Sequence, residues 1–88
     1  MVSESISGTR IKDIKYYGWA VYEDLTVTSG DVKTLDDFVD TENLKNATLI
    51  QNSDGVEIAV TVLDNTVTVG GAVTDQECTL FAFGVMSN

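Results

Sequence analysis

Apolar and polar residues alternate along much of this chain, and a period of two predicts β-strands. The pattern is clearest in Val56–Leu63, where every second residue is Val or Ile. The positions between them hold Glu, Ala, Thr and Leu, which is typical of a sheet with one face in solvent. Further β-favouring segments are Asp13–Tyr22, Leu25–Thr28, Ala47–Gln51, Thr66–Val69 and Cys78–Val85.

Short polar segments separate these strands and predict tight turns. Asn52-Ser53-Asp54-Gly55 ends in Asp-Gly, a favoured hairpin dipeptide because both residues tolerate a positive φ. Asp64-Asn65 predicts a second turn, and Thr74–Glu77 predicts a third. The second half of the chain is therefore expected to form a meander of antiparallel strands.

One segment has helical rather than alternating spacing. Thr34 can cap a helix whose apolar residues are Leu35, Phe38 and Val39, and Asp40 or Thr41 could cap a further turn that reaches residue 45. The sequence thus predicts an all-β fold: a small antiparallel β-sandwich or barrel with one short helical segment at about residues 34–45.

The final strand, Leu80–Met86, is apolar at successive positions and needs cover on both faces. The core can cover one face. Two elements could cover the other, namely a neighbouring subunit or the helical turn expected over Leu35–Val39. The pattern leaves both possibilities open.

Aromatic residues concentrate near the start of the first strand. With alternating faces, Tyr16 and Tyr22 share one side, and Tyr17 and Trp19 share the other. One pair is expected in the core, and the other is then exposed or at a contact, since Tyr and Trp are enriched at interfaces. Stacking on a sugar is the alternative use of an exposed pair. The candidate interface residues are Tyr17, Trp19, Phe81 and Phe83.

Charge divides the 88 residues unevenly. Residues 1–15 carry a net charge of +1, residues 16–88 carry −10, and the whole chain carries −9. Nucleic-acid binding is therefore not expected, because phosphate contacts need clustered Lys and Arg. Residues 1–10 contain few apolar side chains and are interpreted as a flexible N-terminal arm, while residues 11–88 are interpreted as a single β domain.

Catalytic chemistry finds little support in the composition. The chain has no His, and its one Cys, Cys78, has no basic neighbour in sequence and is interpreted as a small buried residue. The acidic cluster of Asp36, Asp37, Asp40 and Glu42 lacks the order of a calcium loop and is interpreted as a solvated face. We therefore expect no enzyme activity, no cofactor and no metal.

Targeting signals are also missing from the pattern. The first residues are polar, whereas a signal peptide has a basic region followed by an apolar region. No apolar stretch approaches the roughly 20 residues of a membrane helix. We expect synthesis in the cytoplasm without a signal peptide, and no membrane partner.

The Thr/Val hairpin within Gly55–Val69 and the terminal run Cys78–Val85 resemble segments of small bacteriophage virion proteins, such as capsid decoration proteins and short head- or tail-fibre domains. The resemblance implies a β-rich, often trimeric structural module of a virion that binds a capsid or another virion protein. The leading hypothesis is a non-catalytic, self-associating interaction module, with a trimer favoured. The alternative is a small carbohydrate- or ligand-binding β module that uses exposed aromatic residues.

Overall fold

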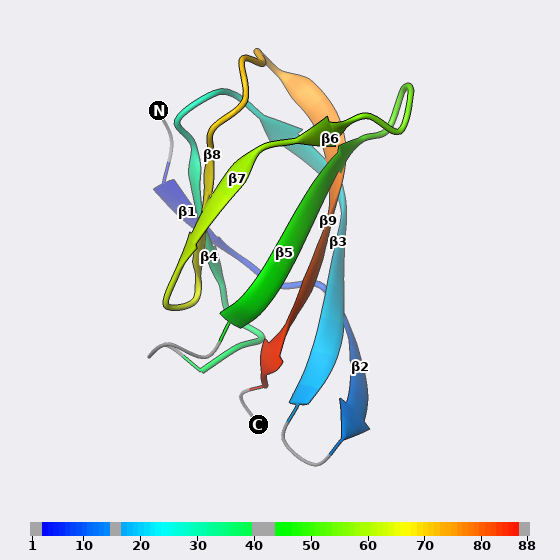
Figure 1. Ribbon diagram of the computed structural model, residues 1–88, viewed down its shortest axis with the longest axis vertical. Coiled ribbons are helices and arrows are strands. Elements are labelled where there is room, and N and C mark those ends of the chain that lie inside the picture. The colour runs from blue at the N-terminus through cyan, green and yellow to red at the C-terminus, as the bar shows by residue number, and fades with distance from the viewer. Residues whose placement is uncertain (1–2, 15–16, 40–43, 87–88) are drawn as a thin grey trace.

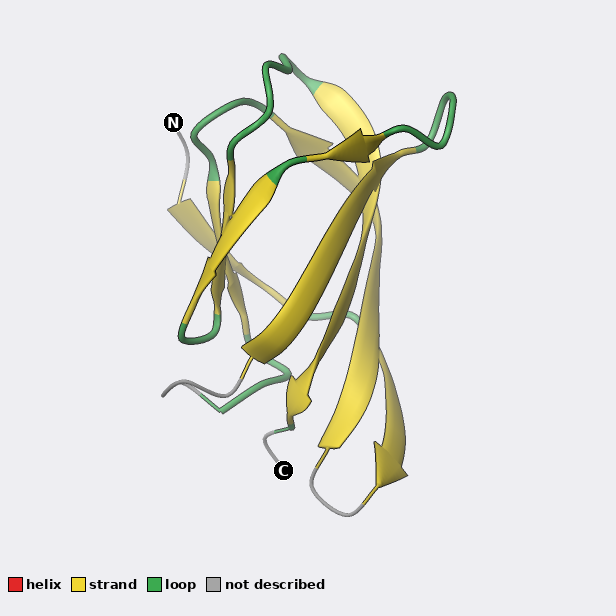
Figure 2. Ribbon diagram, viewed as in Figure 1, coloured by secondary structure: helices red, strands yellow, loops and turns green. Residues whose placement is uncertain are grey.

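Two β-sheets pack face to face in the computed structural model, which describes residues 3–14, 17–39 and 44–86. Every regular element in this part of the chain is a strand, as Figure 2 shows, so the all-β sandwich predicted from sequence is confirmed. The four-stranded sheet has the order β1-β4-β8-β7, and the five-stranded sheet has the order β2-β3-β9-β5-β6 (Figure 1).

The strands of the second half overlap the predicted β-favouring segments, whereas β1 and β4 do not. In the four-stranded sheet they are β1 (Ser3–Ile6), β4 (Val32–Leu35), β7 (Val60–Leu63) and β8 (Thr66–Val69). In the five-stranded sheet they are β2 (Thr9–Ile14), β3 (Tyr17–Val27), β5 (Leu44–Gln51), β6 (Glu57–Ile58) and β9 (Gln76–Val85).

The core lies between the two sheets and is filled by every second residue of the strands. Tyr22, Leu35, Leu49, Val67 and Leu80 are among its buried members, each no more than 2% exposed. Because the side-chain period of a strand is two, the residues between them point away from the core. This alternation decides which side chains are left for contact with other molecules.

The pairing of β3 with β9 forms the centre of the five-stranded sheet. The two strands are antiparallel, with Trp19 opposite Phe83 and Tyr22 opposite Leu80. The register shifts between Tyr22 and Leu25, where Asp24 has a φ of 58°. Because of this bulge, the predicted segment that begins at Leu25 continues the same strand as the segment that ends at Tyr22.

Two of the predicted turns are confirmed. The Asn52–Gly55 turn joins β5 to β6, with Gly55 at a φ of 74° and its N–H donating to the carbonyl of Gln51 at 2.9 Å. Asp64 and Asn65 join β7 to β8, and Asp64 has a φ of 54°.

The meander predicted for the second half is wrong in two places. The predicted strand Val56–Leu63 is divided between the sheets, with β6 in the five-stranded sheet and β7 in the four-stranded sheet. After β8 the chain crosses to the other sheet, where β9 lies between β3 and β5. The strand contains mainly apolar residues, and the central position buries its inner face and satisfies backbone hydrogen bonds on both edges.

The helical segment predicted at residues 34–45 is also wrong where the structure describes it. Thr34 lies within β4 and pairs with Ser5 on one side and Thr66 on the other. The chain then turns, Phe38 forms a bridge with Met86, and β5 begins at Leu44. Strand pairing overrides the helical spacing because a helix this short has little stability of its own. The proposed caps Asp40 and Thr41 lie outside the described residues.

The flexible arm expected at residues 1–10 is, from Ser3 onward, part of the sandwich. β1 runs parallel to β4, and β2 runs antiparallel to β3, starting at Thr9. Backbone pairing is the reason, because it needs little apolar content in the paired strand. The N-terminal segment therefore contributes an edge strand to each sheet.

Candidate functional site

Large aromatic side chains project from the outer face of the five-stranded sheet. Tyr17 and Trp19 on β3 are 38% and 43% exposed, and Phe81 on β9 is 41% exposed. Phe83, two residues along β9, is half-buried beside them. The four candidate interface residues predicted from sequence are thus brought together on one face, which we call the aromatic face.

Directly behind the aromatic face, the inner side of the same two strands carries only small residues. Gly18 lies opposite Gly84, and Ala20 lies opposite Ala82. All four are buried. The usual distribution of size is therefore inverted over this part of the sheet, with the large side chains outside and the small ones toward the core.

The aromatic rings contact one another. Phe83 stacks on Tyr17 with ring centroids 5.8 Å apart and an interplanar angle of 15°. Trp19 lies against Phe83 at 4.7 Å with an angle of 50°. Phe83 is thus held between two partly exposed rings. These contacts order the side chains before any partner arrives, which lowers the entropic cost of binding.

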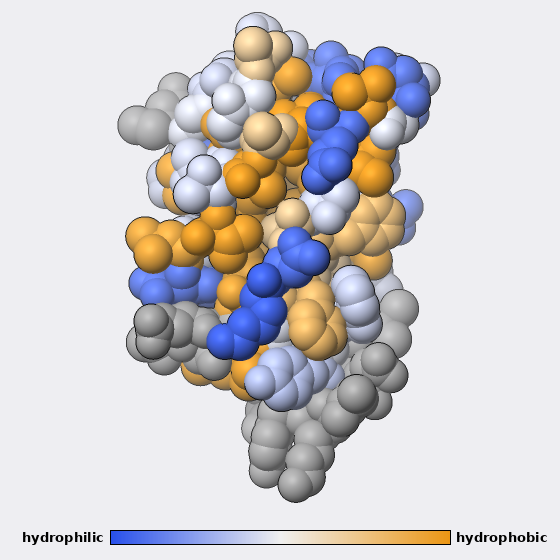
Figure 3. Space-filling view, viewed as in Figure 1, coloured by the Kyte–Doolittle hydropathy of each residue, from blue (hydrophilic) through white to orange (hydrophobic). Residues whose placement is uncertain are grey.

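Most residues around the rings are uncharged, and the exception on β5 is the exposed Lys45. Neither Tyr17–Val21 on β3 nor Phe81–Val85 on β9 contains a charged residue. On the neighbouring strand β5, Thr48 lies opposite Phe81 and Asn46 lies opposite Phe83. Apolar side chains also reach the surface over β5 and β9 in the view of Figure 3.

The division of the N-terminal aromatic residues follows the prediction from alternation. Tyr22 is buried at 2% exposure, whereas Tyr17 and Trp19 face outward. Tyr16 lies outside the described residues. Phe38, from the segment expected to cover the last strand, is itself buried and reaches only the end of β9. Among the described residues, the outer rings of β9 keep their exposure.

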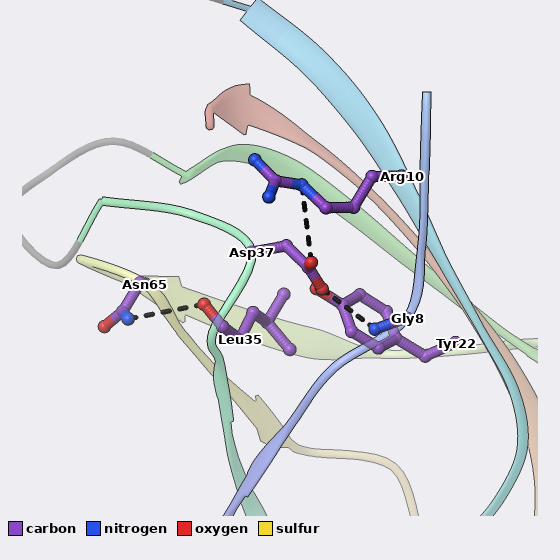
Figure 4. A network of polar contacts seen from close by, with 6 residues as sticks. All are labelled: Gly8, Arg10, Tyr22, Leu35, Asp37 and Asn65. Atoms are coloured by element: carbon purple, nitrogen blue, oxygen red, sulfur yellow. Dashed lines mark hydrogen bonds and ion pairs between the residues drawn. The ribbon is translucent and has the colours of Figure 1, made fainter. Parts of the chain in front are cut away.

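A second cluster, buried and polar, centres on Asp37 (Figure 4). Its carboxylate accepts hydrogen bonds of 2.9 Å from the Tyr22 hydroxyl and the Gly8 backbone N–H, and Arg10 lies 3.5 Å away. Asp37 is only 5% exposed. Its assignment to a solvated acidic face is therefore wrong, because three donors distant in sequence converge on this one carboxylate.

Burial changes the chemistry of two groups. Burial raises the pKa of the Tyr22 phenol well above its ordinary value, and the hydrogen bond to Asp37 raises it further. Burial also raises the pKa of the Cys78 thiol, as expected from its interpretation as a small buried residue. Neither group is poised to react, so these residues stabilise the fold.

A buried cation forms a third feature that the sequence did not reveal. Lys33 on β4 is 3% exposed, and its ammonium pairs with the carboxylate of Glu4 on β1. Glu4 lies opposite Lys33 in the parallel register of these strands. Alternation places Lys33 inward, but only the pairing with β1 explains how its charge is accommodated.

The described residues hold neither a cluster typical of a metal site nor a helix typical of a membrane span. No three His, Cys, Asp or Glu side chains there are grouped so as to hold a metal ion. No helix of sufficient length and hydrophobicity to cross a membrane occurs in the same residues. Comparison with known proteins gave no match to a family model, and no similar curated protein or solved structure was found.

Proposed function

We propose that this protein is a non-catalytic structural module that self-associates through the aromatic face. The observation that carries the proposal is the inverted distribution of side-chain size on β3 and β9. Placing Trp19 and Phe81 in solvent while Ala20 and Ala82 occupy the core side costs hydrophobic stabilisation in an isolated subunit. Burial of the rings against another subunit recovers that free energy.

The exposed area of the aromatic rings is smaller than the area that a stable interface buries. Tyr17, Trp19 and Phe81 together expose on the order of 300 Å², whereas a stable interface takes about 800 Å² from each partner. The rings therefore supply the anchoring centre of an interface, where binding energy concentrates. The uncharged residues of β3, β5 and β9 around them supply its rim.

A virion is the setting that we propose for this assembly, as a capsid decoration or fibre component that also contacts a capsid or other virion protein. The support is the resemblance of Gly55–Val69 and Cys78–Val85 to segments of small bacteriophage virion proteins. We favour a trimer on the same ground.

Replacement of the exposed rings tests the proposal. Trp19→Thr and Phe81→Thr remove apolar area but keep a residue that favours strands. Leu63→Thr is the matched control, since Leu63 is 69% exposed on β7 of the other sheet. Light scattering across a concentration series is expected to show an oligomer for the parent and the control, and a shift toward monomer of at least tenfold in dissociation constant for the two aromatic-face variants.

The fluorescence of Trp19, the one Trp of the chain, provides an independent reading. Dilution should shift its emission to longer wavelength as subunits separate and the ring enters water. A parent protein that remains monomeric at high micromolar concentration, with emission unchanged on dilution, would contradict self-association.

Carbohydrate binding is the second candidate, and the exposed ring of Phe81 favours it because a free ring can stack on a sugar. The ring contacts of Phe83 with Tyr17 and Trp19 weigh against it, since they occupy faces that a sugar would need. Quenching of Trp19 fluorescence by a panel of glycans, in a protein that stays monomeric, would favour this alternative.

A further inference from the structure

The edge of β4 is built to receive a particular strand. Lys33 is buried at 3% exposure, and its position on β4 leaves its charge dependent on an acid in the strand alongside. Two residues further on, Leu35 is fully buried and lies opposite Ile6, which packs against the core. An occupant of this edge must therefore be extended, run parallel to β4, and carry an acid and an apolar residue two positions apart.

β1 meets these requirements but is weakly attached to the rest of its own subunit. Ser3, Glu4 and Ser5 are exposed, and only Ile6 is partly buried. Among the described residues, β1 is held by the ladder with β4, the Glu4–Lys33 ion pair, and a hydrogen bond of 2.9 Å from the N–H of Asp36 to the carbonyl of Ile6. In Figure 1, β1 lies at the flank of the sandwich.

Gly8, two residues beyond the strand, is by contrast firmly held. The N–H of Gly8 donates to Asp37, and a Cβ on Gly8 would lie only 2.4 Å from the Val21 carbonyl oxygen. β2 then pairs with β3 from Thr9 onward. Detachment of β1 would thus pivot at Ser7 and leave the body from Gly8 onward in place.

We propose that copies of this chain exchange β1, so that Ser3–Ile6 of one copy lies against β4 of another. The exchanged strand makes the same ladder, the same Glu4–Lys33 ion pair and the same Ile6 contact as it does within one subunit. Only the course of the chain at Ser7 changes. Since the contacts are identical, the balance between the two forms depends on protein concentration and on the conformation of the pivot.

A second copy is the occupant that the chemistry favours. An open β4 edge would leave a buried ammonium without its counter-ion, which is costly. The sequence Glu4-Ser5-Ile6 of another copy supplies the acid and the apolar residue at the required spacing. The exchange uses the edge of the four-stranded sheet and is independent of the aromatic face on the other sheet.

Two variants, each with one added cysteine, test the exchange. Ser5 lies opposite Thr34 in the register of β1 and β4, and both side chains point away from the core. Ser5→Cys and Thr34→Cys, each with buried Cys78 retained, are mixed in denaturant, refolded together at high micromolar concentration and oxidised. If β1 is exchanged, the new thiol of one variant meets that of the other, and non-reducing gels and mass spectrometry should show a linked heterodimer as the main product.

Matched controls separate exchange from chance collisions. Ser5→Cys mixed with Thr61→Cys pairs two outer-face positions that are not opposite each other, because Thr61 lies opposite Thr68. That mixture, and each variant alone, should give at least fivefold less linked product. Equal yields in all mixtures would overturn the proposal.

The same mixture in a Trp19→Thr background keeps the two proposals distinct. Heterodimer that persists in this background, together with loss of the parent's other association, supports both the exchange and the aromatic face. Heterodimer that disappears with Trp19→Thr would show that the linkage requires the aromatic face and would overturn independent exchange.

Discussion

At the scale of single residues, Asp37 contacts two segments that are distant from it in sequence, the N-terminal segment and β3. Its carboxylate binds Gly8 before β2, Arg10 within β2 and Tyr22 within β3. Buried carboxylates need such donors because an unpaired buried charge is costly. These polar contacts therefore add to the apolar contact of Ile6 in joining the N-terminal segment to the body.

The pH dependence of stability should reveal the buried phenol of Tyr22. Its pKa is raised in the folded state, so folding favours the neutral phenol, and stability is lost as the pH rises past the unfolded value of about 10. Tyr22→Phe should lower the free energy of unfolding at neutral pH by about 1–2 kcal/mol, because Asp37 loses a donor. Between about pH 9.5 and 11.5 the variant should lose less stability than the parent.

Urea denaturation of both proteins across this pH range measures the difference. Every other titrating group is common to the two proteins, so the comparison isolates the effect of Tyr22. Parallel curves for the two proteins would show that Tyr22 does not titrate differently on folding.

At the scale of elements, the ion pair between β1 and β4 should behave as a coupled unit. Glu4→Gln leaves the buried ammonium of Lys33 with a neutral partner and should lower the free energy of unfolding by about 1–2 kcal/mol. In a Lys33→Met background the same change should cost little, because no buried charge remains. Urea denaturation of the four proteins gives the coupling energy, and strictly additive effects would contradict the pairing.

The elements also show how far the sequence could predict this fold. Alternation located most strands and separated Tyr22 from Tyr17 and Trp19, because the period of two is a local property. It failed for residues 34–39, where the spacing of Leu35 and Phe38 suits a helix but Thr34 is held in a ladder between Ser5 and Thr66. Partners this distant in sequence leave no local signal.

The sequence was enough to name the residues of the candidate site. It did not predict the strand pairing that exposes them. Tyr17 and Trp19 could be named from the alternation of the aromatic residues, and Phe81 and Phe83 because β9 is apolar at successive positions. Their exposure depends on β9 lying beside β3 with Gly84 opposite Gly18, and that register is set by long-range pairing. The Asp37 and Lys33 contacts were missed for the same reason.

At the scale of the whole molecule, the net charge of −9 should oppose self-association. Raising the ionic strength from about 0.01 M to about 0.15 M shortens the screening length from about 30 Å to about 8 Å. Because the aromatic face is uncharged, this change should strengthen association severalfold. Light scattering at matched protein concentrations tests it, with sucrose as a nonionic control, and association that weakens with salt would instead indicate intersubunit ion pairs.

The central position of β9 has a consequence for how the protein is made. β9 follows every other strand in the sequence, yet it lies between β3 and β5. As the chain leaves the ribosome, β3 and β5 have emerged while the strand that joins them is still to come. The hydrogen-bonding edges of both strands then stay open until synthesis reaches β9, and during that interval they are free to pair with strands of other nascent chains.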